Sequence, residues 1–159
     1  MLDNAEKLEA QLDVAIVAHE NEDYTTAAGI YNQILEADPN HPDANHNFAV
    51  LSVKLGLIDN ALGFIEKAIN TNPHVYEYWV TLIDALLQLE RFEDAHKALG
   101  QAKSLGHDQK VFMELNDAVK SKAKSSAPKM LTESQLLETE KRISELSKKL
   151  EKLKIEAQK

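Results

Sequence analysis

Small and hydrophobic residues recur along this chain at a fixed offset of 34 positions, and one column of the register holds Ala27, Ala61 and Ala95. A period of this length is the sequence signature of a stacked repeat architecture. The chain therefore predicts three copies of one structural unit. The further columns are Gln11/Asn45/Trp79, Val14/Phe48/Leu82, Ala15/Ala49/Ile83, Ala18/Ser52/Leu86, Tyr31/Ile65/Leu99 and Ile34/Ala68/Ala102.

Each copy is predicted to form two helices, which in the middle copy span about 42–55 and 58–70. Pro42 suits the first turn of a helix, and Gly56 suits a C-terminal cap. Asn72-Pro73 should end the second helix, because proline disfavours helical geometry in the residue before it. The third copy has Gly106-His107 at this place, so a helix breaker is retained without the proline.

The small residues of the repeat predict close packing between its two helices. Ala49 and Ala61 allow the helices to approach, and Phe48, Leu62 and Ile65 fill the space around them. One such hairpin cannot bury its own apolar face, whereas stacked neighbours can. We therefore expect an all-α solenoid of helical hairpins.

The pattern resembles the tetratricopeptide repeat family, whose consensus is W-x2-L-G-x2-Y, then A-x3-F, then P over 34 residues. The resemblance covers about residues 8–107 and implies repeats at about 8–41, 42–75 and 76–107. The motif residues present are Trp79-x2-Leu82, Ala95-x3-Leu99, Phe48-Ala49, Ala61-x3-Ile65, Pro73, Ala27-x3-Tyr31 and Pro39. The departures are Gln11 and Asn45 in the Trp column, Glu22 and Glu90 in the column of Gly56, and the absent third proline.

After the repeats, residues 108–123 predict a helix that caps the third repeat and completes a first domain at 1–123. Asp108 is placed to cap its start. Residues 124–131 then predict a linker, since Ser125, Ser126 and Pro128 disfavour helix. The apolar stripe of the capping helix is Val111, Phe112, Leu115 and Val119.

Residues 132–159 predict a long amphipathic helix that opens with a capping box of Thr132 and Gln135. Its apolar positions alternate in steps of three and four, which is a heptad pattern. Such a seam requires a partner surface, and two remain open: a coiled-coil homodimer, or docking against the acidic repeats of the same or a neighbouring chain. The seam consists of Leu136, Thr139, Ile143, Leu146, Leu150, Leu153 and Ala157.

Charge divides the chain into two parts. Residues 1–120 hold 8 Lys/Arg and 20 Asp/Glu, a net of −12, and residues 121–159 hold 10 Lys/Arg and 6 Glu, a net of +4. The acidic part should repel phosphate backbones, which argues against nucleic-acid binding, and it favours basic or amphipathic partners. We found no signal peptide and no apolar run of membrane-spanning length. We therefore expect a cytoplasmic protein without a membrane partner.

The residues that could support catalysis or metal binding do not form a recognisable constellation. There is no cysteine, which excludes disulfides and thiol chemistry. None of the six histidines pairs with another at the i, i+4 spacing of a helical metal site. Nucleophile elbows and glycine-rich phosphate loops are absent as well. We therefore expect no enzymatic activity, no cofactor and no bound metal.

The resemblance implies a concave groove lined by the first helix of each repeat. The family's recurrent groove Asn corresponds to Asn47, whose amide can bond both groups of a peptide backbone. The columns used elsewhere in the family to clamp a terminal carboxylate hold Leu12, Ile16, Glu77 and Thr81, which argues against that ligand. The predicted groove residues are Glu9, Leu12, Asp13, Ile16, His19, Glu20, Asp43, His46, Asn47, Val50, Val53, Lys54, Glu77, Val80, Thr81, Asp84, Leu87 and Gln88.

Two functions fit these features. The first is a non-catalytic module that binds a peptide or helix of a partner protein in the groove. The second is a scaffold segment of a larger enzyme, because residues 76–108 resemble the last repeat of bacterial proteins that place such arrays before a glycosyl-, sulfo- or methyltransferase domain.

Overall fold

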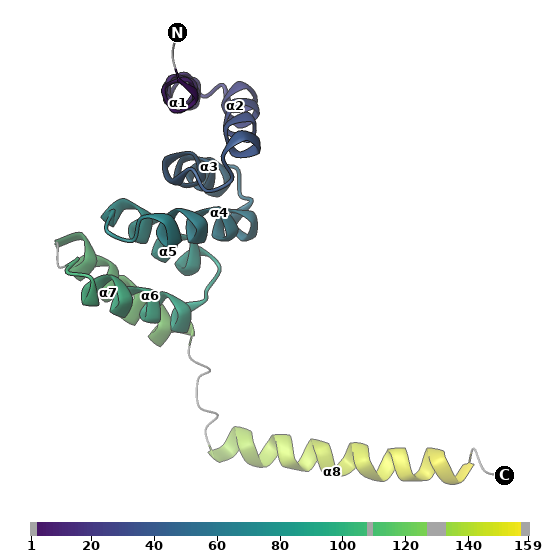
Figure 1. Cartoon of the computed structure of the whole chain (residues 1–159). Coiled ribbons are helices and arrows are strands. Elements are labelled where there is room, and N and C mark those ends of the chain that lie inside the picture. Colours follow the sequence, from purple (N-terminus) through teal and green to yellow (C-terminus); the bar gives the residue numbers. More distant parts are fainter. Residues whose placement is uncertain (1–2, 108–109, 127–132, 157–159) are drawn as a thin grey trace. The chain divides into compact units, whose positions relative to one another are not determined.

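The computed structural model describes residues 3–107, 110–126 and 133–156, and these form eight helices (Figure 1). Six of them pair as three hairpins, as the 34-residue register predicts. The bounds are α1 Asn4–Glu20, α2 Tyr24–Ala37, α3 Pro42–Lys54, α4 Ile58–Thr71, α5 Tyr76–Gln88, α6 Phe92–Ser104, α7 Lys110–Ser126 and α8 Glu133–Glu156. The prediction of an all-α helical-hairpin solenoid is thereby confirmed.

The turn inside each repeat ends the first helix with a left-handed residue. Gly56 has φ 76°, and the residues in its column adopt the same conformation, Glu22 at 62° and Glu90 at 56°. In each turn the next N–H reaches back to the helix, as when Leu57 N donates to Ser52 O at 2.8 Å. The cap predicted at Gly56 is therefore present in all three repeats, although in two of them a non-glycine residue adopts a strained conformation to form it.

The turns between repeats are tied by the residue in the Trp column. Trp79 Nε1 donates to Pro73 O at 2.8 Å, and Asn45 Nδ2 donates to Pro39 O at 3.0 Å. Each bond spans six residues, so two different side chains make one structural link. Pro73 O also lies 3.2 Å from His107 Nε2, which must carry the proton because a carbonyl can only accept.

Most repeat columns are buried, and Val14 in the first repeat is an exception. Ala49, Ala61 and Ile65 have no exposed surface, and Leu62 is buried beside them. Val14 is largely exposed, although Leu82 in its column is buried. Phe48 of the same column meets the Tyr31 ring of the preceding repeat with centroids 5.8 Å apart, so this column faces the preceding repeat.

Helix α7 extends the core of the third repeat. Phe112 and Val119 are buried in one cluster with α6 residues such as Leu99, and His107 stacks on Phe112 with ring centroids 5.9 Å apart. The predicted apolar stripe is confirmed, but the helix continues to Ser126. The predicted linker 124–131 is therefore wrong at 124–126, and its other residues, like Asp108, lie outside the described residues.

Helix α8 belongs to a second compact unit, Ser126–Lys159, which is described here by itself. Ile143 and Leu146 of the predicted seam are 58% and 64% exposed within this unit. Its side chains are described at 137, 138 and 140–149, so those of Leu136, Thr139, Leu150 and Leu153, the capping box and Ala157 lie outside the described residues. In the part of the chain that is described, no helix has the length and apolar character needed to cross a membrane.

Candidate functional site

The first helices of the repeats form one continuous surface, which we call the inner face. Helix α3 contacts both α1 and α5, whereas among residues 3–107 the second helices α2, α4 and α6 make no such contacts with one another. A stack whose first helices lie closer together than its second helices must curve toward the first helices. The inner face is therefore the concave side of the array, where the sequence predicts the groove.

Four side chains join α3 to α5 across the inner face. Tyr78 donates its hydroxyl hydrogen bond to Asp43, and His46 Nε2 lies 3.0 Å from Thr81 Oγ1. The His46 ring packs on Tyr78 with centroids 4.8 Å apart. These contacts fix the spacing between the second and third repeats and leave the carboxylate of Asp43 on the surface.

The protonation of this cluster is set mainly by burial. Burial lowers the pKa of His46, and it outweighs the opposing effect of the Asp43 and Glu77 carboxylates. Burial also raises the pKa of Tyr78, and the hydrogen bond to Asp43 adds to the shift. At neutral pH the cluster therefore contains a neutral imidazole and a protonated phenol.

The middle of the inner face carries Asn47, Val50 and Val53, all of them half-buried. Asn47 Nδ2 donates to Asp43 O at 2.8 Å, one turn earlier in α3. This bond uses one of the two amide hydrogens, so the second hydrogen and Oδ1 can make other contacts.

The junction between α1 and α3 has different chemistry. Lys54 Nζ lies 5.0 Å from the centroid of the Tyr24 ring, and the His19 ring meets Tyr24 edge-on at 6.0 Å. Burial lowers the pKa of His19, and the nearby Lys54 charge acts in the same direction. Glu9 reaches His41 Nε2 at 3.5 Å. At this end of the inner face, a lysine cation lies over an aromatic ring.

Two predicted groove residues are not available to a ligand. Leu12 is 4% exposed and Leu87 is 5% exposed, because each packs into a hydrophobic cluster between the helices. The prediction was wrong for these two, because both leucines pack into the core, although the other members of their columns are half-buried, namely His46, Val80, His19 and Val53. Ile16, Val80 and Thr81 are half-buried. The exposed predicted residues are Glu9, Asp13, Glu20, Asp43, Lys54, Glu77, Asp84 and Gln88.

Sequence reasoning did not assign Tyr78 or Tyr24 to the inner face. A signal for Tyr78 was present, because Asp43–Tyr78 and His46–Thr81 are both separated by 35 residues. This separation is one residue longer than the 34-residue repeat, so it joins residues on equivalent turns of successive first helices. Tyr24 opens α2, so no first-helix column includes it.

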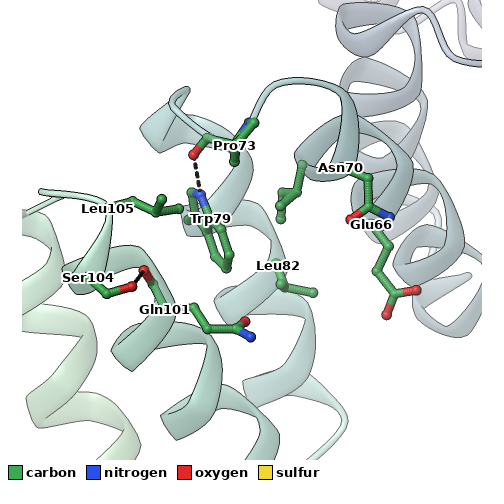
Figure 2. A pocket seen from close by; sticks show the side chains of 9 residues that line it. Glu66, Asn70, Pro73, Trp79, Leu82, Gln101, Ser104 and Leu105 are labelled. Carbon is green, nitrogen blue, oxygen red and sulfur yellow. Dashed lines mark hydrogen bonds between the residues drawn. The ribbon is translucent and has the colours of Figure 1, made fainter.

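A pocket of about 570 Å³ lies away from the inner face, between α4 and α6. Figure 2 shows Trp79 between Leu105, Ser104 and Gln101 on one side and Asn70 and Glu66 on the other. The pocket exists because α4 and α6 do not contact each other, so the space between them is open down to α5. Its full lining is Glu66, Ile69, Asn70, Pro73, Trp79, Leu82, Gln101, Ser104 and Leu105.

No group of three His, Asp or Glu side chains within the described ranges is arranged to hold a metal ion. The residues described above are instead suited to contacts with another polypeptide. They offer surface carboxylates, amides and half-buried aliphatic groups along a curved face.

Comparison with known proteins places the repeats in context. The rice (Oryza sativa subsp. japonica) Protein SGT1 homolog is 28% identical over 111 residues, which cover 70% of this chain and 29% of the relative. The chain thus spans less than a third of that protein. The Sgt2 TPR domain from Aspergillus fumigatus superposes with a TM-score of 0.69 at 18% identity, over 80% of this chain and 87% of that one.

A second similar structure is that of the "First TPR of Spaghetti (RPAP3) bound to HSP90 peptide SRMEEVD". It superposes with a TM-score of 0.67 at 19% identity, over 76% of this chain and 96% of that one. At this identity the superposition establishes the fold alone. A family model with the description "Anaphase-promoting complex, cyclosome, subunit 3" matches residues 20–102, just over half of the chain. The chain belongs to this family and is a tetratricopeptide repeat protein.

Proposed function

We propose that this chain is a non-catalytic protein-interaction module whose inner face binds a basic or amphipathic segment of a partner protein. The observation that carries the proposal is the composition of that face. Half-buried Ile16, Val50 and Val53 lie among exposed carboxylates contributed by all three first helices. An amphipathic helix or extended peptide could place apolar side chains on the aliphatic residues and cations beside the carboxylates.

The same composition argues against an acidic ligand. The peptide named with the RPAP3 structure, SRMEEVD, has three acidic residues among its last four. On this chain the corresponding surface offers Glu77 and buries Leu12. A carboxylate-rich tail would meet like charges and find no cation at either position, which should disfavour it by several kcal/mol. We therefore place the partner in a different chemical class.

The proposal is tested by affinity capture with the full chain, followed by measurement of each captured partner's affinity for variants. Val50→Glu puts a charge in the aliphatic part of the inner face, and Asn47→Ala removes an amide that could bond a peptide backbone. Asn47→Ala should weaken binding about five- to a hundredfold. Asp84→Lys should weaken a basic partner further, and Glu36→Lys, the same type of charge reversal on α2, should not.

A partner that binds folded Val50→Glu, Asn47→Ala and Asp84→Lys as tightly as the wild-type chain would show that the inner face is the wrong surface. Circular dichroism of each variant confirms that the helices are intact. A purified chain that turns over a substrate, with the activity abolished by one substitution, would contradict the non-catalytic assignment.

The apolar seam of α8 is a second proposed contact surface. Exposed Ile143 and Leu146 lie three residues apart on a helix that also carries six cations between residues 141 and 154. We propose that they pack against an acidic helical surface or a second α8. Ile143→Glu combined with Leu146→Glu should lower the mass measured by light scattering if α8 forms a homodimer, and Leu137→Glu serves as a control outside the seam.

The alternative function, a scaffold segment of a larger glycosyl-, sulfo- or methyltransferase, stays a prediction. A catalytic domain encoded in the same open reading frame would establish it. Among the described residues, neither the inner face nor the pocket contains a feature specific to that role.

A further inference from the structure

The pocket between α4 and α6 has an apolar floor whose polar atom is already satisfied. Trp79 is 5% exposed, and its Nε1 hydrogen is bonded to Pro73 O, as the dashed line in Figure 2 shows. The indole therefore offers ring carbon to the pocket, beside Leu82 and Ile69. A volume of about 570 Å³ lies within the range of ligand pockets. The floor suits a large apolar side chain.

The rim of the same pocket favours a positive charge. Glu66 is exposed, and within the described part of the chain no lysine, arginine or histidine forms an ion pair with it. The pocket also lies at the C-terminal ends of two helices, since α4 ends at Thr71 and α6 ends at Ser104. Helix C-termini carry partial negative charge, so these two ends add to the effect of the carboxylate, against the one N-terminus of opposite sign where α5 begins at Tyr76.

Two amides complete the rim from opposite walls. Asn70 comes from α4 and Gln101 from α6, and Figure 2 shows them on either side of Trp79. Each amide can donate to a carbonyl and accept from an N–H, which are the two groups of a peptide backbone. Ser104 differs, because its hydroxyl already donates to Gln101 O at 2.7 Å.

The preceding junction has the same architecture but a different set of side chains. Asn45 occupies the Trp79 column there, and Asn32 occupies the Glu66 column. Thr71 donates to Asn40 O at 3.3 Å across that junction, whereas Leu105 stands in the Thr71 column at the next one. Glu36 and Lys67 stand there in the Asn70 and Gln101 columns, so the residues of that rim include both a carboxylate and a lysine. The indole floor, and a rim with a carboxylate but no lysine in these columns, are thus features of one junction and not consequences of the repeat.

We propose that the pocket between α4 and α6 is a second docking site, separate from the inner face. Its occupant is a short segment of a partner protein in which a large apolar side chain is followed by lysine or arginine. The apolar side chain covers Trp79 and Leu82, and the cation lies between Glu66 and the helix ends.

Trp79 is the only tryptophan in the chain, so its fluorescence reports on this pocket directly. The probes are blocked heptapeptides Gly-Ser-X-Arg-Lys-Ser-Gly with X as Leu, Ile, Phe or Tyr, titrated into the full chain. Matched peptides replace Arg-Lys by Glu-Glu, or X by Ser. We expect at least one X-Arg-Lys peptide to shift the Trp79 emission saturably, and its two matched peptides to bind about tenfold more weakly or not at all.

Three variants locate the site. Ser104→Phe fills the pocket without adding a second indole and should abolish the shift. Glu66→Gln should weaken binding about three- to tenfold, while Glu36→Gln, a matched carboxylate on α2, should leave it unchanged. Thermal melting shows whether each variant is folded. If Ser104→Phe does not fold, Gln101→Phe takes its place as the variant that fills the pocket.

The proposal is overturned if all four X-Arg-Lys peptides fail to shift the emission, or if the Glu-Glu peptides bind equally well. It is also overturned if binding survives Ser104→Phe and Glu66→Gln but is lost in Val50→Glu. That last result would place the peptide on the inner face and support the proposed function while removing the second site. Binding that is unaffected by Val50→Glu and lost in Ser104→Phe supports the pocket.

Discussion

The two junctions between repeats share a backbone but differ in the side chains that hold it. In both, the residue of the Trp column bonds to the carbonyl of the proline six residues earlier. Asn45 does this with a small amide that also bonds His41 O at 2.9 Å. Trp79 does it with one N–H and a large ring. The first junction therefore depends on hydrogen bonds and the second on buried apolar area.

The inner-face side of the two junctions shows the reverse division, with the hydrogen bond at the second junction and a small apolar residue at the first. Tyr78 bridges α5 to Asp43 on α3, whereas Ala44 in the same column is a buried small residue that makes no side-chain hydrogen bond. A repeat consensus fixes the geometry of the chain, and the residues that vary within it decide what each junction can bind. At the second junction one such residue is Trp79, which lines the pocket.

Among the substitutions that test this difference between the junctions, Trp79→Ala should lower the folding stability most. Removing a buried indole deletes its packing and leaves a cavity, a change that costs about 3–5 kcal/mol in folding free energy. Trp79→Phe keeps most of the ring and loses the bond to Pro73 O, so we expect a cost of about 1–2 kcal/mol. Urea titration followed by circular dichroism measures both. Equal costs for the two variants would show that the hydrogen bond, and not the ring, holds the second junction.

Asn45→Ala should have the next largest effect. It removes the side-chain donor to Pro39 O and His41 O from a residue that is itself fully buried, which should cost about 2 kcal/mol. Gln11 occupies the same column in the first repeat but is exposed, so Gln11→Ala should change stability by less than about 0.5 kcal/mol. A cost for Asn45→Ala no greater than that of Gln11→Ala would contradict a hydrogen-bonded first junction.

Tyr78→Phe should have a smaller effect. It removes a hydrogen bond to a carboxylate, worth about 1–2 kcal/mol where the acceptor is exposed. The matched control is Tyr76→Phe, because Tyr76 is on the surface at the start of the same helix. A double-mutant cycle with Asp43→Asn isolates the interaction energy between Tyr78 and Asp43. A coupling energy near zero would mean that Tyr78 holds α3 and α5 together through ring packing alone.

Sequence reasoning succeeded where the repeat register decides the structure, and failed where individual side chains do. The columns of Ala49, Ala61 and Ile65 predicted the hairpins and their core, because small and apolar residues at a fixed offset have one packing solution. Leu12 and Leu87 were misplaced because a column does not fix the burial of each member: His46 and Val53 share these columns and are half-buried, whereas the two leucines pack into the core. The pocket was not predicted, because the space between α4 and α6 depends on how far their side chains extend into it, and the repeat register does not specify this.

The smallest effect concerns pH and the His46 contact on the inner face. Burial lowers the pKa of His46 in the folded chain, so the unfolded chain, with a pKa near 6.5, binds the proton more readily. This residue's contribution to stability is therefore fully present above about pH 6.5 and declines as the pH falls toward the folded pKa. We expect the decline in the free energy of unfolding between pH 7.5 and 5.5 to be smaller in His46→Gln than in the wild-type chain, by less than about 1 kcal/mol.

His19→Gln is the matched variant at the first junction, because burial and Lys54 lower the pKa of His19 as well. Urea titrations across this pH range measure the slopes, and NMR of the imidazole protons gives each folded pKa. A folded pKa for His46 at or above 6.5 would mean that the Asp43 and Glu77 carboxylates outweigh burial, and the sign of the slope would then reverse.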